Sequence, residues 1–278
     1  MLVVHHQSYP VESAEFIQMA KIIAVTNQKG GVGKTTTSVN LAASLGANRH
    51  RVLLVDLDPQ GNATMGSGVD KNHLEKGSSY EVIMGNVHLS KAVVPLSEAG
   101  YVLLPANGNL TAAEVELLDA KMREQRLRLA LAQVKDKYDF ILVDCPPSLS
   151  MLTVNALVAA HAALIPIQCE YYALEGLTSL ISTIDKIRSR LNPQLRIAGL
   201  LRTMFDPRNN LANEVSAQLV THFRDQLYTT IIPRNVRLAE APSHGQPVLL
   251  YDRASRGALS YMALASEVAR REANYPMS

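Results

Sequence analysis

The chain has 278 residues and a mass of 30.3 kDa; 47% of its residues are hydrophobic, 19% are charged, and the formal net charge is +2 at pH 7. This composition is typical of a soluble globular protein rather than a disordered or membrane-embedded one. No run approaches the roughly 18 apolar residues of a membrane-spanning helix. The most apolar stretch, residues 153–167, is interrupted by Asn155, His161 and Pro166.

The N-terminal residues and the cysteines limit the choice of compartment. Residues 1–18 lack the charged region and long apolar region of a secretory signal. We therefore expect a disordered extension over residues 1–18, a single domain over residues 19–278 and a cytoplasmic location. The two cysteines, Cys145 and Cys169, are too few for a disulfide framework, and each follows an apolar run. They are predicted to be buried free thiols.

Short β-branched or leucine-rich runs alternate with segments of helical spacing, a pattern typical of βαβ units. Strands are predicted at residues 21–27, 51–56, 101–104, 140–144, 162–167, 196–204 and 229–232. Amphipathic helices are predicted at residues 35–45, 111–134, 174–191, 211–227 and 254–271. Because several strands are apolar on both faces, we predict an α/β fold, a doubly wound and mainly parallel sheet with helices on both faces. Its ligand crevice is expected at the carboxyl ends of the strands.

The segment KGGVGKTTT, residues 29–37, directly follows the first predicted strand and opens the first predicted helix. Glycine-rich N–H groups at a helix N-terminus bind phosphate, Lys34 adds positive charge at the β- and γ-phosphates, and the Thr35 hydroxyl is suited to ligate Mg²⁺. The strict P-loop pattern requires glycine where this chain has Gln28, and Lys29 heads the motif instead. A lysine at that position is able to reach a phosphate in a partner's site. The motif predicts ATP binding.

Aspartates end two further apolar runs. In RVLLVDLDPQGNAT, residues 51–64, Asp56 and Asp58 stand two apart and are predicted to face the P-loop crevice together. One would serve Mg²⁺ through water and the other would orient the attacking water; capping of the following turn is the alternative. The run YDFILVDCPPS, residues 138–148, ends its strand at Asp144, which is predicted to hold Mg²⁺ or its waters.

These motifs, together with QCEYYALEGL at residues 168–177 and IPRNVRLAEAPSHGQPVLLYDRASRGA at residues 232–258, resemble the ParA/Soj family of chromosome- and plasmid-partitioning ATPases. That family belongs to the MinD/ParA superfamily of P-loop NTPases with a deviant Walker A motif. The resemblance covers residues 19–268, and the C-terminal motif distinguishes the family from other deviant Walker A proteins.

The resemblance implies a role for each matching residue. Lys29 would cross a dimer interface, Lys34 would bind phosphates in its own site, and Asp58 would position the hydrolytic water; these three are the predicted catalytic residues. Metal binding is assigned to Thr35, Asp56 and Asp144. The nucleotide would contact Lys29, Gly30, Gly31, Val32, Gly33, Lys34, Thr35, Thr36, Pro233 and Asn235, with Thr36 on the α-phosphate and the last two beside adenine.

Charge is distributed unevenly along the chain. Residues 186–278 carry 13 Lys or Arg, of which 12 are Arg, against 7 Asp or Glu, whereas residues 1–185 have a net charge of −4. Such an asymmetry suggests nucleic-acid contact, with a solvated basic face as the alternative. By the resemblance, Arg208 and Arg237 would contact the DNA backbone, although DPRNNL at residues 206–211 has Asn209 where many relatives have threonine.

The resemblance also implies partners and a location. ATP would assemble a homodimer that binds double-stranded DNA without sequence preference. A ParB/Spo0J-type centromere-binding protein would stimulate slow hydrolysis of ATP, and the protein would be associated with the nucleoid.

Three alternatives remain from other classes. A membrane-associated division regulator is disfavoured because the tail EVARREANYPMS contains Pro276 and no long apolar face, so no membrane insertion is expected. An iron–sulfur reductase is disfavoured by the cysteine spacing, and a gel shift with duplex DNA would distinguish an ATP-binding scaffold.

Overall fold

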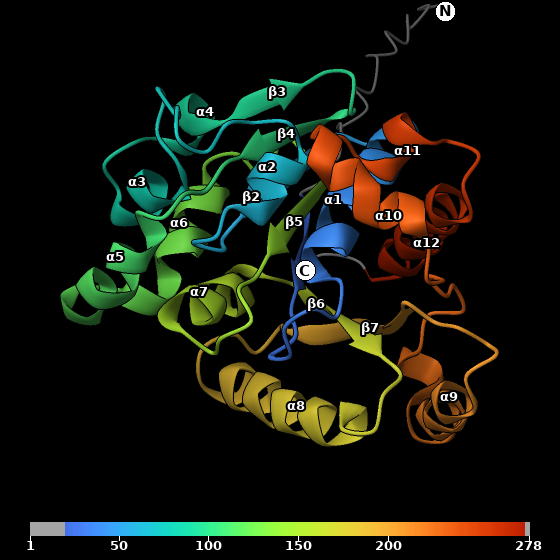
Figure 1. The fold of residues 1–278 in the computed structure, drawn as a ribbon. Coiled ribbons are helices and arrows are strands. Elements are labelled where there is room, and N and C mark those ends of the chain that lie inside the picture. Colours follow the sequence, from blue (N-terminus) through green and yellow to red (C-terminus); the bar gives the residue numbers. More distant parts are fainter. Residues whose placement is uncertain (1–19, 276–278) are drawn as a thin grey trace, which may run out of the picture.

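The computed structural model describes residues 20–275, so the expected extension over residues 1–18 lies outside the described residues. Seven strands form one sheet in the order β3-β4-β2-β5-β1-β6-β7, in which β3 and β4 are antiparallel and every other neighbouring pair is parallel (Figure 1). The strands are β1 (Lys21–Val25), β2 (Val52–Asp56), β3 (Val94–Leu96), β4 (Tyr101–Leu104), β5 (Phe140–Asp144), β6 (Ala162–Gln168) and β7 (Arg196–Thr203). The predicted doubly wound α/β fold is confirmed.

Helices and 3-10 turns cover both faces of this sheet. The helices are α1 (Lys34–Ala47), α2 (Asn62–Gly66), α3 (Ser79–Met84), α4 (Leu89–Ala92), α5 (Leu110–Glu116), α6 (Arg126–Ala132), α7 (Met151–Ala159), α8 (Ala173–Arg190), α9 (Asn210–Phe223), α10 (Val236–Glu240), α11 (Val248–Tyr251) and α12 (Arg256–Ala273). The 3-10 turns are η1 (Leu117–Asp119), η2 (Arg123–Gln125), η3 (Arg224–Gln226) and η4 (Ala241–His244). Within residues 20–275 no helix combines the length and apolarity that crossing a membrane requires.

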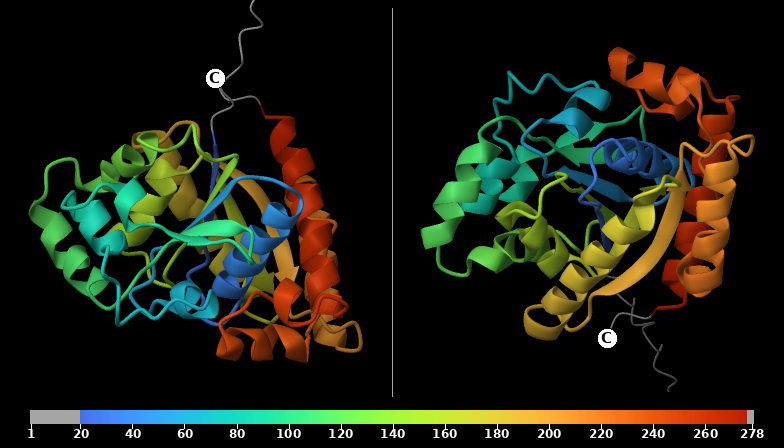
Figure 2. Two further views of the ribbon diagram at one scale, coloured as in Figure 1. Left: turned by 90° about the horizontal axis from the view of Figure 1, so that it is seen from above. Right: turned by 60° about the horizontal axis from the view of Figure 1, so that its bottom comes forward.

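Alternation along the strands divides the core into two layers. In β1, Ile22 and Ala24 belong to a cluster with α3 to α9, whereas Ile23 and Val25 belong to a second cluster with α1, α2 and α10 to α12. Two views of the ribbon show these helix layers on opposite sides of the sheet (Figure 2). Because successive strand residues point to opposite faces, a strand that is apolar throughout must lie between two covered faces. The continuous apolar runs of the sequence therefore correspond to internal strands.

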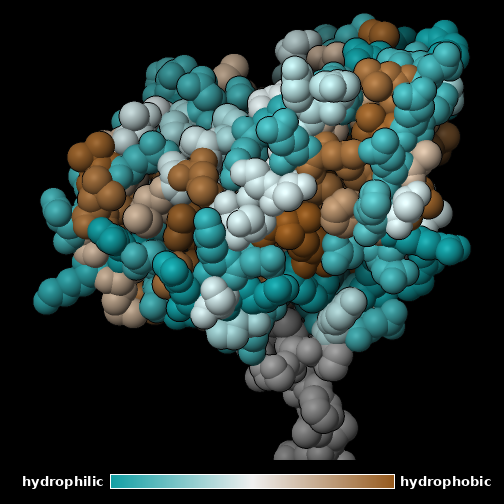
Figure 3. All heavy atoms as spheres, turned by 90° about the horizontal axis from the view of Figure 1, so that it is seen from below, coloured by the Kyte–Doolittle hydropathy of each residue, from teal (hydrophilic) through white to brown (hydrophobic). Residues whose placement is uncertain are grey.

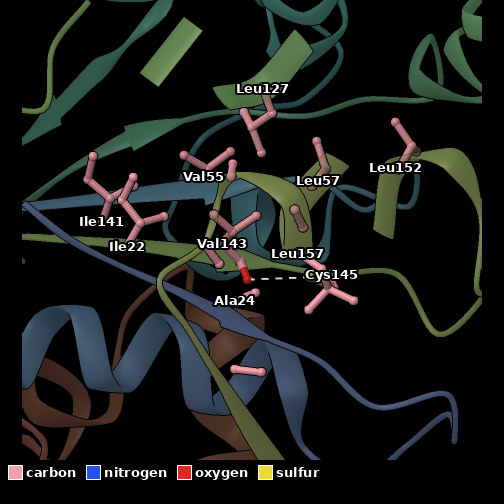
Figure 4. Packing of buried hydrophobic residues seen from close by; sticks show 14 of the residues in the cluster. Ile22, Ala24, Val55, Leu57, Leu127, Ile141, Val143, Cys145, Leu152 and Leu157 are labelled. Atoms are coloured by element: carbon pink, nitrogen blue, oxygen red, sulfur yellow. Dashed lines mark hydrogen bonds between the residues drawn. The ribbon is translucent and has the colours of Figure 1, made fainter. Parts of the chain in front are cut away.

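Both cysteines are buried free thiols, as predicted. Cys145 directly follows β5, and its thiol points toward the Val143 carbonyl at 3.7 Å within the first cluster (Figure 4). Burial raises the pKa of both thiols above the ordinary value, that of Cys169 to about 11. Neither thiol is therefore a thiolate at neutral pH, and both pack as small apolar groups.

Two sequence predictions are wrong. Residues 229–232 form no strand: the backbone N–H groups of Thr229 and Thr230 donate to the Glu267 carboxylate of α12 at 2.9 Å each, and only the Ile232 N–H of this segment donates to β7, at the Arg202 carbonyl. The long helix expected over residues 111–134 is divided into α5, η1, η2 and α6, with Met122 in the left-handed region at φ 54°. Helical spacing alone does not reveal this interruption.

Apolar side chains also reach the surface. On the face shown in Figure 3 they form separate patches among hydrophilic residues. The most exposed large ones within residues 20–275 are Tyr171, Val236, Val115 and Tyr172. Scattered exposure of this kind is ordinary for a globular protein and by itself identifies no binding surface.

A close backbone contact joins α1 to the turn between β3 and β4. A Cβ atom added at Gly46, near the end of α1, would lie 2.1 Å from the carbonyl oxygen of Gly100, whose φ of +77° is also in the left-handed region. The added Cβ would contact backbone atoms of Gly100, so a change of side-chain rotamer does not relieve the clash. Gly46 is therefore required for packing, although glycine disfavours a helix interior.

We predict that Gly46→Ala lowers the free energy of unfolding by about 1 to 3 kcal/mol, because the overpacking cost exceeds the gain in helix propensity. Gly176→Ala is the matched control, since Gly176 lies in α8 with no atom within 4 Å of the added Cβ. That variant should be more stable by about 0.5 to 1 kcal/mol. Urea unfolding of the two variants would measure both changes, and equal stability would contradict the contact.

Candidate functional site

A cavity of about 470 Å³ opens at the carboxyl ends of the central strands. Three chain segments supply most of its wall: the P-loop, the loop after β2, and the segments that follow β7. The lining residues are Gly30, Gly31, Gly33, Lys34, Thr35, Thr36, Asp58, Gln60, Asn62, Pro147, Thr203, Met204, Ile232, Pro233, Arg234, Asn235, Leu238, Ala239 and Tyr261. This is the place at which an open α/β sheet binds its ligands.

The P-loop forms the cradle that its sequence predicts. Gly31 and Gly33 have φ values of +73° and +87°, which only glycine adopts without strain. Gly33 is the N-cap of α1 and provides no side-chain cap, so the first-turn N–H groups of a 14-residue helix lie at the cavity without a side-chain acceptor. Free N–H groups at the positive end of a helix dipole suit a phosphate group.

The two lysines of the motif point in different directions. Lys34 lines the cavity and is 7% exposed, and its Nζ donates to the backbone oxygen of Lys29 at 3.2 Å. Burial lowers the pKa of Lys34, while the Asp144 charge opposes that shift. Lys29 does not line the cavity; its half-exposed side chain forms an ion pair with Glu170, which follows β6. Lys29 is therefore not available to a phosphate in its own cavity in this conformation.

Asp144 is fully buried behind the P-loop rather than in the cavity wall. Its Oδ2 accepts a hydrogen bond from the Thr35 hydroxyl at 2.8 Å, and its Oδ1 accepts one from the Ser38 hydroxyl at 2.8 Å. Burial raises the pKa of Asp144, and the neighbouring Asp56 charge adds to this effect. A cation ligated by Thr35 would stabilise the charged carboxylate, so the donor set fits a Mg²⁺ ion held beside Thr35.

Asp56 aligns with Asp144 across the β2–β5 pair and is also fully buried. Its carboxylate accepts hydrogen bonds from the Thr64 hydroxyl and N–H at 2.7 and 2.8 Å, and from the Asp58 N–H at 3.1 Å. Burial is the main cause of its raised pKa. Asp56 thus holds the loop that carries Asp58, in addition to the magnesium role predicted for it.

Asp58 does line the cavity, with its Oδ1 accepting a hydrogen bond from the Gln60 N–H at 2.9 Å. The sequence prediction that Asp56 and Asp58 reach the same crevice therefore applies to Asp58 alone, because Asp56 ends β2 in the core. Within residues 20–275 no group of three or more His, Cys, Asp or Glu side chains could hold a metal ion without other ligands. A Mg²⁺ ion bound here would be coordinated by the Thr35 hydroxyl and by phosphate oxygens of the nucleotide, because Mg²⁺ usually takes few protein ligands and completes its shell with phosphates and water.

Pro233 and Asn235 lie in the cavity wall with Met204 and Tyr261. The Asn235 Oδ1 is buried and has no hydrogen-bond partner. This oxygen packs close to Gly257 of α12, where an added Cβ would lie 3.2 Å from it. A buried acceptor without a donor is costly, so a turn of the Asn235 amide toward a ligand N–H group would be favourable. The largely apolar wall at this end of the cavity fits the nucleobase predicted there.

Several wall residues were not predicted from the sequence. Gln60, Asn62 and Met204 belong to no phosphate motif, and Met204 has a strained φ of 49°. Thr203, at the end of β7, donates from its hydroxyl to the Val32 carbonyl at 2.8 Å and so connects β7 to the P-loop. Val32 itself does not line the cavity. Nothing in the sequence indicates that contact, because the partners are 171 residues apart.

Arg208 and Arg237 lie outside the cavity. The Arg208 side chain is 89% exposed and that of Arg237 is 49% exposed. Arg208 lies in the loop before α9 and Arg237 in α10, and the two segments are neighbours, since Phe205 and Pro233 form a β-bridge and the Arg234 N–H donates to the Phe205 carbonyl at 3.2 Å. The structure therefore brings these two predicted arginines to adjacent segments beside the cavity.

Comparison with known proteins identifies relatives of this site and fold. Residues 20–197 match the family model described as an AAA domain. The chain is 52% identical to the sporulation initiation inhibitor protein Soj of Bacillus subtilis, over 90% of this chain and 99% of that protein. It is 49% identical to the chromosome partitioning protein ParA of Myxococcus xanthus, over 91% of this chain and 89% of that protein.

A solved structure of similar fold is that of cobyrinic acid a,c-diamide synthase from Mycobacterium smegmatis with a bound ATP analogue and magnesium. It is 37% identical, has a TM-score of 0.80, and the match covers 93% of this chain and 98% of that chain. The fold and the P-loop site described above are therefore shared with a protein that has been seen with a nucleotide and magnesium.

We predict that Thr203→Val lowers the free energy of unfolding by about 1 to 3 kcal/mol, because valine keeps the shape but removes the donor to the Val32 carbonyl. Amide hydrogen exchange over residues 30–33 should become faster. Thr221→Val is the control, since the Thr221 hydroxyl is exposed and bonds only within its own helix. Unchanged exchange in the P-loop of Thr203→Val would contradict a connection between β7 and the P-loop.

Proposed function

Because the chain belongs to the ParA/Soj family of partitioning ATPases, we propose that it is a Mg²⁺-dependent ATPase whose ATP-bound form is a DNA-binding homodimer. It drives chromosome or plasmid segregation together with a ParB-type centromere-binding partner. The observation that carries this proposal is the arrangement of the two P-loop lysines, of which Lys34 faces its own cavity and Lys29 does not.

ATP and Mg²⁺ are the ligands that the cavity supports best. The glycine-rich loop binds the phosphates, Lys34 supplies positive charge at the β- and γ-phosphates, and Thr36 lies where the α-phosphate would be bound. When bound beside Thr35, Mg²⁺ neutralises charge on the phosphate oxygens. Asp58, in the opposite wall, orients the water that attacks the γ-phosphate, and Asn235 accepts a hydrogen bond from the base.

The position of Lys29 supports dimerisation. Lys29 is attached to the P-loop but lies outside its own cavity, and a two-fold partner would bring a second cavity within its reach. To reach it, Lys29 must exchange the exposed carboxylate of Glu170 for a phosphate. Exposed ion pairs contribute at most about 1 kcal/mol, so this exchange is energetically accessible.

The DNA-binding surface is proposed around Arg208 and Arg237, which lie beside the cavity in a loop and in the neighbouring helix α10. Residues 186–278 have a net charge of +6, but these charges are spread over several elements. A two-fold dimer doubles the number of arginines that reach one duplex. Because non-specific affinity depends on the number of phosphates neutralised, ATP-driven dimerisation would turn weak attraction into binding that reads no base.

The diamide synthase named for the Mycobacterium smegmatis structure is a second candidate within this fold. Its identity to the chain is 37%, against 52% and 49% for the Soj and ParA relatives, and the higher identities favour partition. A gel shift with random-sequence duplex DNA, with and without ATP, distinguishes the two. ATP-dependent binding supports partition, and its absence contradicts the DNA-binding part of the proposal.

Two lysine variants should separate the nucleotide site from the dimer. Lys34→Ala is expected to abolish ATP binding, because it removes the charge at the β- and γ-phosphates. Lys29→Ala should bind ATP as a monomer that neither dimerises nor hydrolyses ATP. Calorimetry gives the affinity, and size-exclusion chromatography with light scattering gives the oligomeric state. An ATP-dependent dimer of Lys29→Ala, or normal ATP affinity of Lys34→Ala, would show that the two roles are wrongly assigned.

Asp58→Ala should accumulate as an ATP-bound dimer, since the loss of the water-orienting carboxylate slows hydrolysis by about 10²- to 10⁴-fold while the phosphate contacts remain. Phosphate release and light scattering in ATP would measure the two effects. Asp70→Ala is the control, because Asp70 is an exposed aspartate that does not line the cavity. If Asp58→Ala hydrolyses ATP at the wild-type rate, Asp58 has no such role.

A further inference from the structure

Carboxylates hold both arginines that are predicted to contact DNA. The Arg208 guanidinium donates from Nε to Asp206 Oδ1 at 2.9 Å and from one terminal nitrogen to Asp206 Oδ2 at 2.7 Å, a two-pronged pair. The Arg237 guanidinium lies between two carboxylates, with Glu240 Oε2 at 2.8 Å and Asp252 Oδ2 at 3.2 Å. Both arginines therefore already commit one edge of the guanidinium, which has five N–H donors in all, to carboxylates.

Three other exposed arginines form no such close pair. No ion pair involves Arg234, Arg253 or Arg256 within the part of the chain that the structure describes, although the Arg234 charge also acts on Asp206 from farther away. The pairing of Arg208 and Arg237 is therefore a property of these two positions rather than of every arginine on this side of the molecule.

We propose that Asp206, Glu240 and Asp252 compete with the DNA backbone for Arg208 and Arg237, and so keep the DNA affinity of the dimer low. The inference rests on the proposed DNA-binding function. Its ligand chemistry is the phosphodiester, which takes the planar guanidinium fork in the same way as a carboxylate does. A phosphate that takes the paired edge of a guanidinium has to displace the carboxylate, and a phosphate on the remaining N–H groups still meets the negative charge of that carboxylate.

Exposure sets the size of this effect. All three pairs lie at the surface, where ion pairs are weak, so the carboxylates reduce DNA binding without preventing it. Removal of one carboxylate should strengthen binding by roughly two- to fivefold per site, and by about 4- to 25-fold for a dimer with two equivalent sites. A low affinity of this origin allows rapid exchange along DNA while ATP is still bound.

The competition should persist across the physiological pH range. The bonds from Arg208 lower the pKa of Asp206 to about 2, and the bond from Arg237 lowers the pKa of Glu240. Both carboxylates are thus charged at any pH at which the protein is studied. A test therefore needs substitutions that remove the charge and keep the shape.

The experiment measures duplex affinity by fluorescence anisotropy with random-sequence DNA, Mg²⁺ and a slowly hydrolysed ATP analogue. The backbone N–H of Arg208 donates to Asp206 Oδ1 at 3.0 Å. Asp206→Asn removes the negative charge but keeps an oxygen that accepts this backbone hydrogen bond. Glu240→Gln with Asp252→Asn does the same for Arg237. Asp185→Asn is the matched control, because Asp185 forms an equally exposed pair with Arg188 at 2.8 Å on α8. Light scattering checks that every variant still dimerises.

We expect Asp206→Asn to bind DNA about 4- to 25-fold more tightly, the Glu240→Gln/Asp252→Asn variant, which removes two carboxylates per site, to gain at least as much, and Asp185→Asn to bind like the wild type. Arg208→Ala should weaken binding and reduce the salt slope by about 1 for each DNA phosphate that the variant no longer neutralises. In the Arg208→Ala background, Asp206→Asn should lose most of its effect, because the arginine for which Asp206 and phosphate compete is gone.

Two outcomes overturn the inference alone. One is that Arg208→Ala weakens binding but neither set of carboxylate variants strengthens it. The other is that Asp206→Asn strengthens binding equally with and without Arg208, which would indicate general repulsion of DNA rather than competition. If the wild type and all variants fail to bind duplex DNA in the dimeric state, the proposed DNA-binding function is wrong, and the inference falls with it.

Discussion

The buried carboxylate of Asp144 connects the sheet to the phosphate-binding loop. Its two oxygens accept hydrogen bonds from Thr35 and Ser38 in the first turns of α1, and it stands at the end of β5 between β1 and β2. An isolated charge at such a place would be expensive, and the raised pKa reflects that cost. Two hydroxyl donors and a nearby lysine, Lys34, reduce it. The P-loop is thus fixed to a central strand of the sheet, and the position of the cavity follows from that connection.

The loop after β2 depends on the same central strands. Asp56, beside Asp144, holds Thr64 and the backbone of Asp58, so the side chain proposed to orient water is supported from the core rather than from solvent. Catalytic groups need this support, because a shift of about 1 Å at the reacting atoms is costly. The buried Asp56 therefore fixes the backbone position from which Asp58 faces the cavity.

The proposed DNA surface is built differently. Thr203 contacts the P-loop, and the next residue, Met204, lies in the cavity wall. The chain reaches the surface within a few more residues, where the Arg208 side chain is 89% exposed. The buried aspartates of the site are held by several bonds each, whereas the arginines are held only by exposed ion pairs. A rigid nucleotide site beside easily rearranged arginines suits a protein that binds one ligand specifically and another without sequence preference.

The sequence alone determined the fold class, the P-loop, the strand-end aspartates and the family, since each depends on residues close together in the chain. It did not show that Thr229 and Thr230 bond to the Glu267 side chain, or that the run of residues 111–134 is broken at Met122. Only the tertiary structure decided the partners of Lys29 and Arg237 and left Asn235 Oδ1 without one. Packing brings together side chains from distant segments of the chain, and these contacts decide which groups are buried, paired or left without a partner. No local sequence pattern shows which distant side chains will meet.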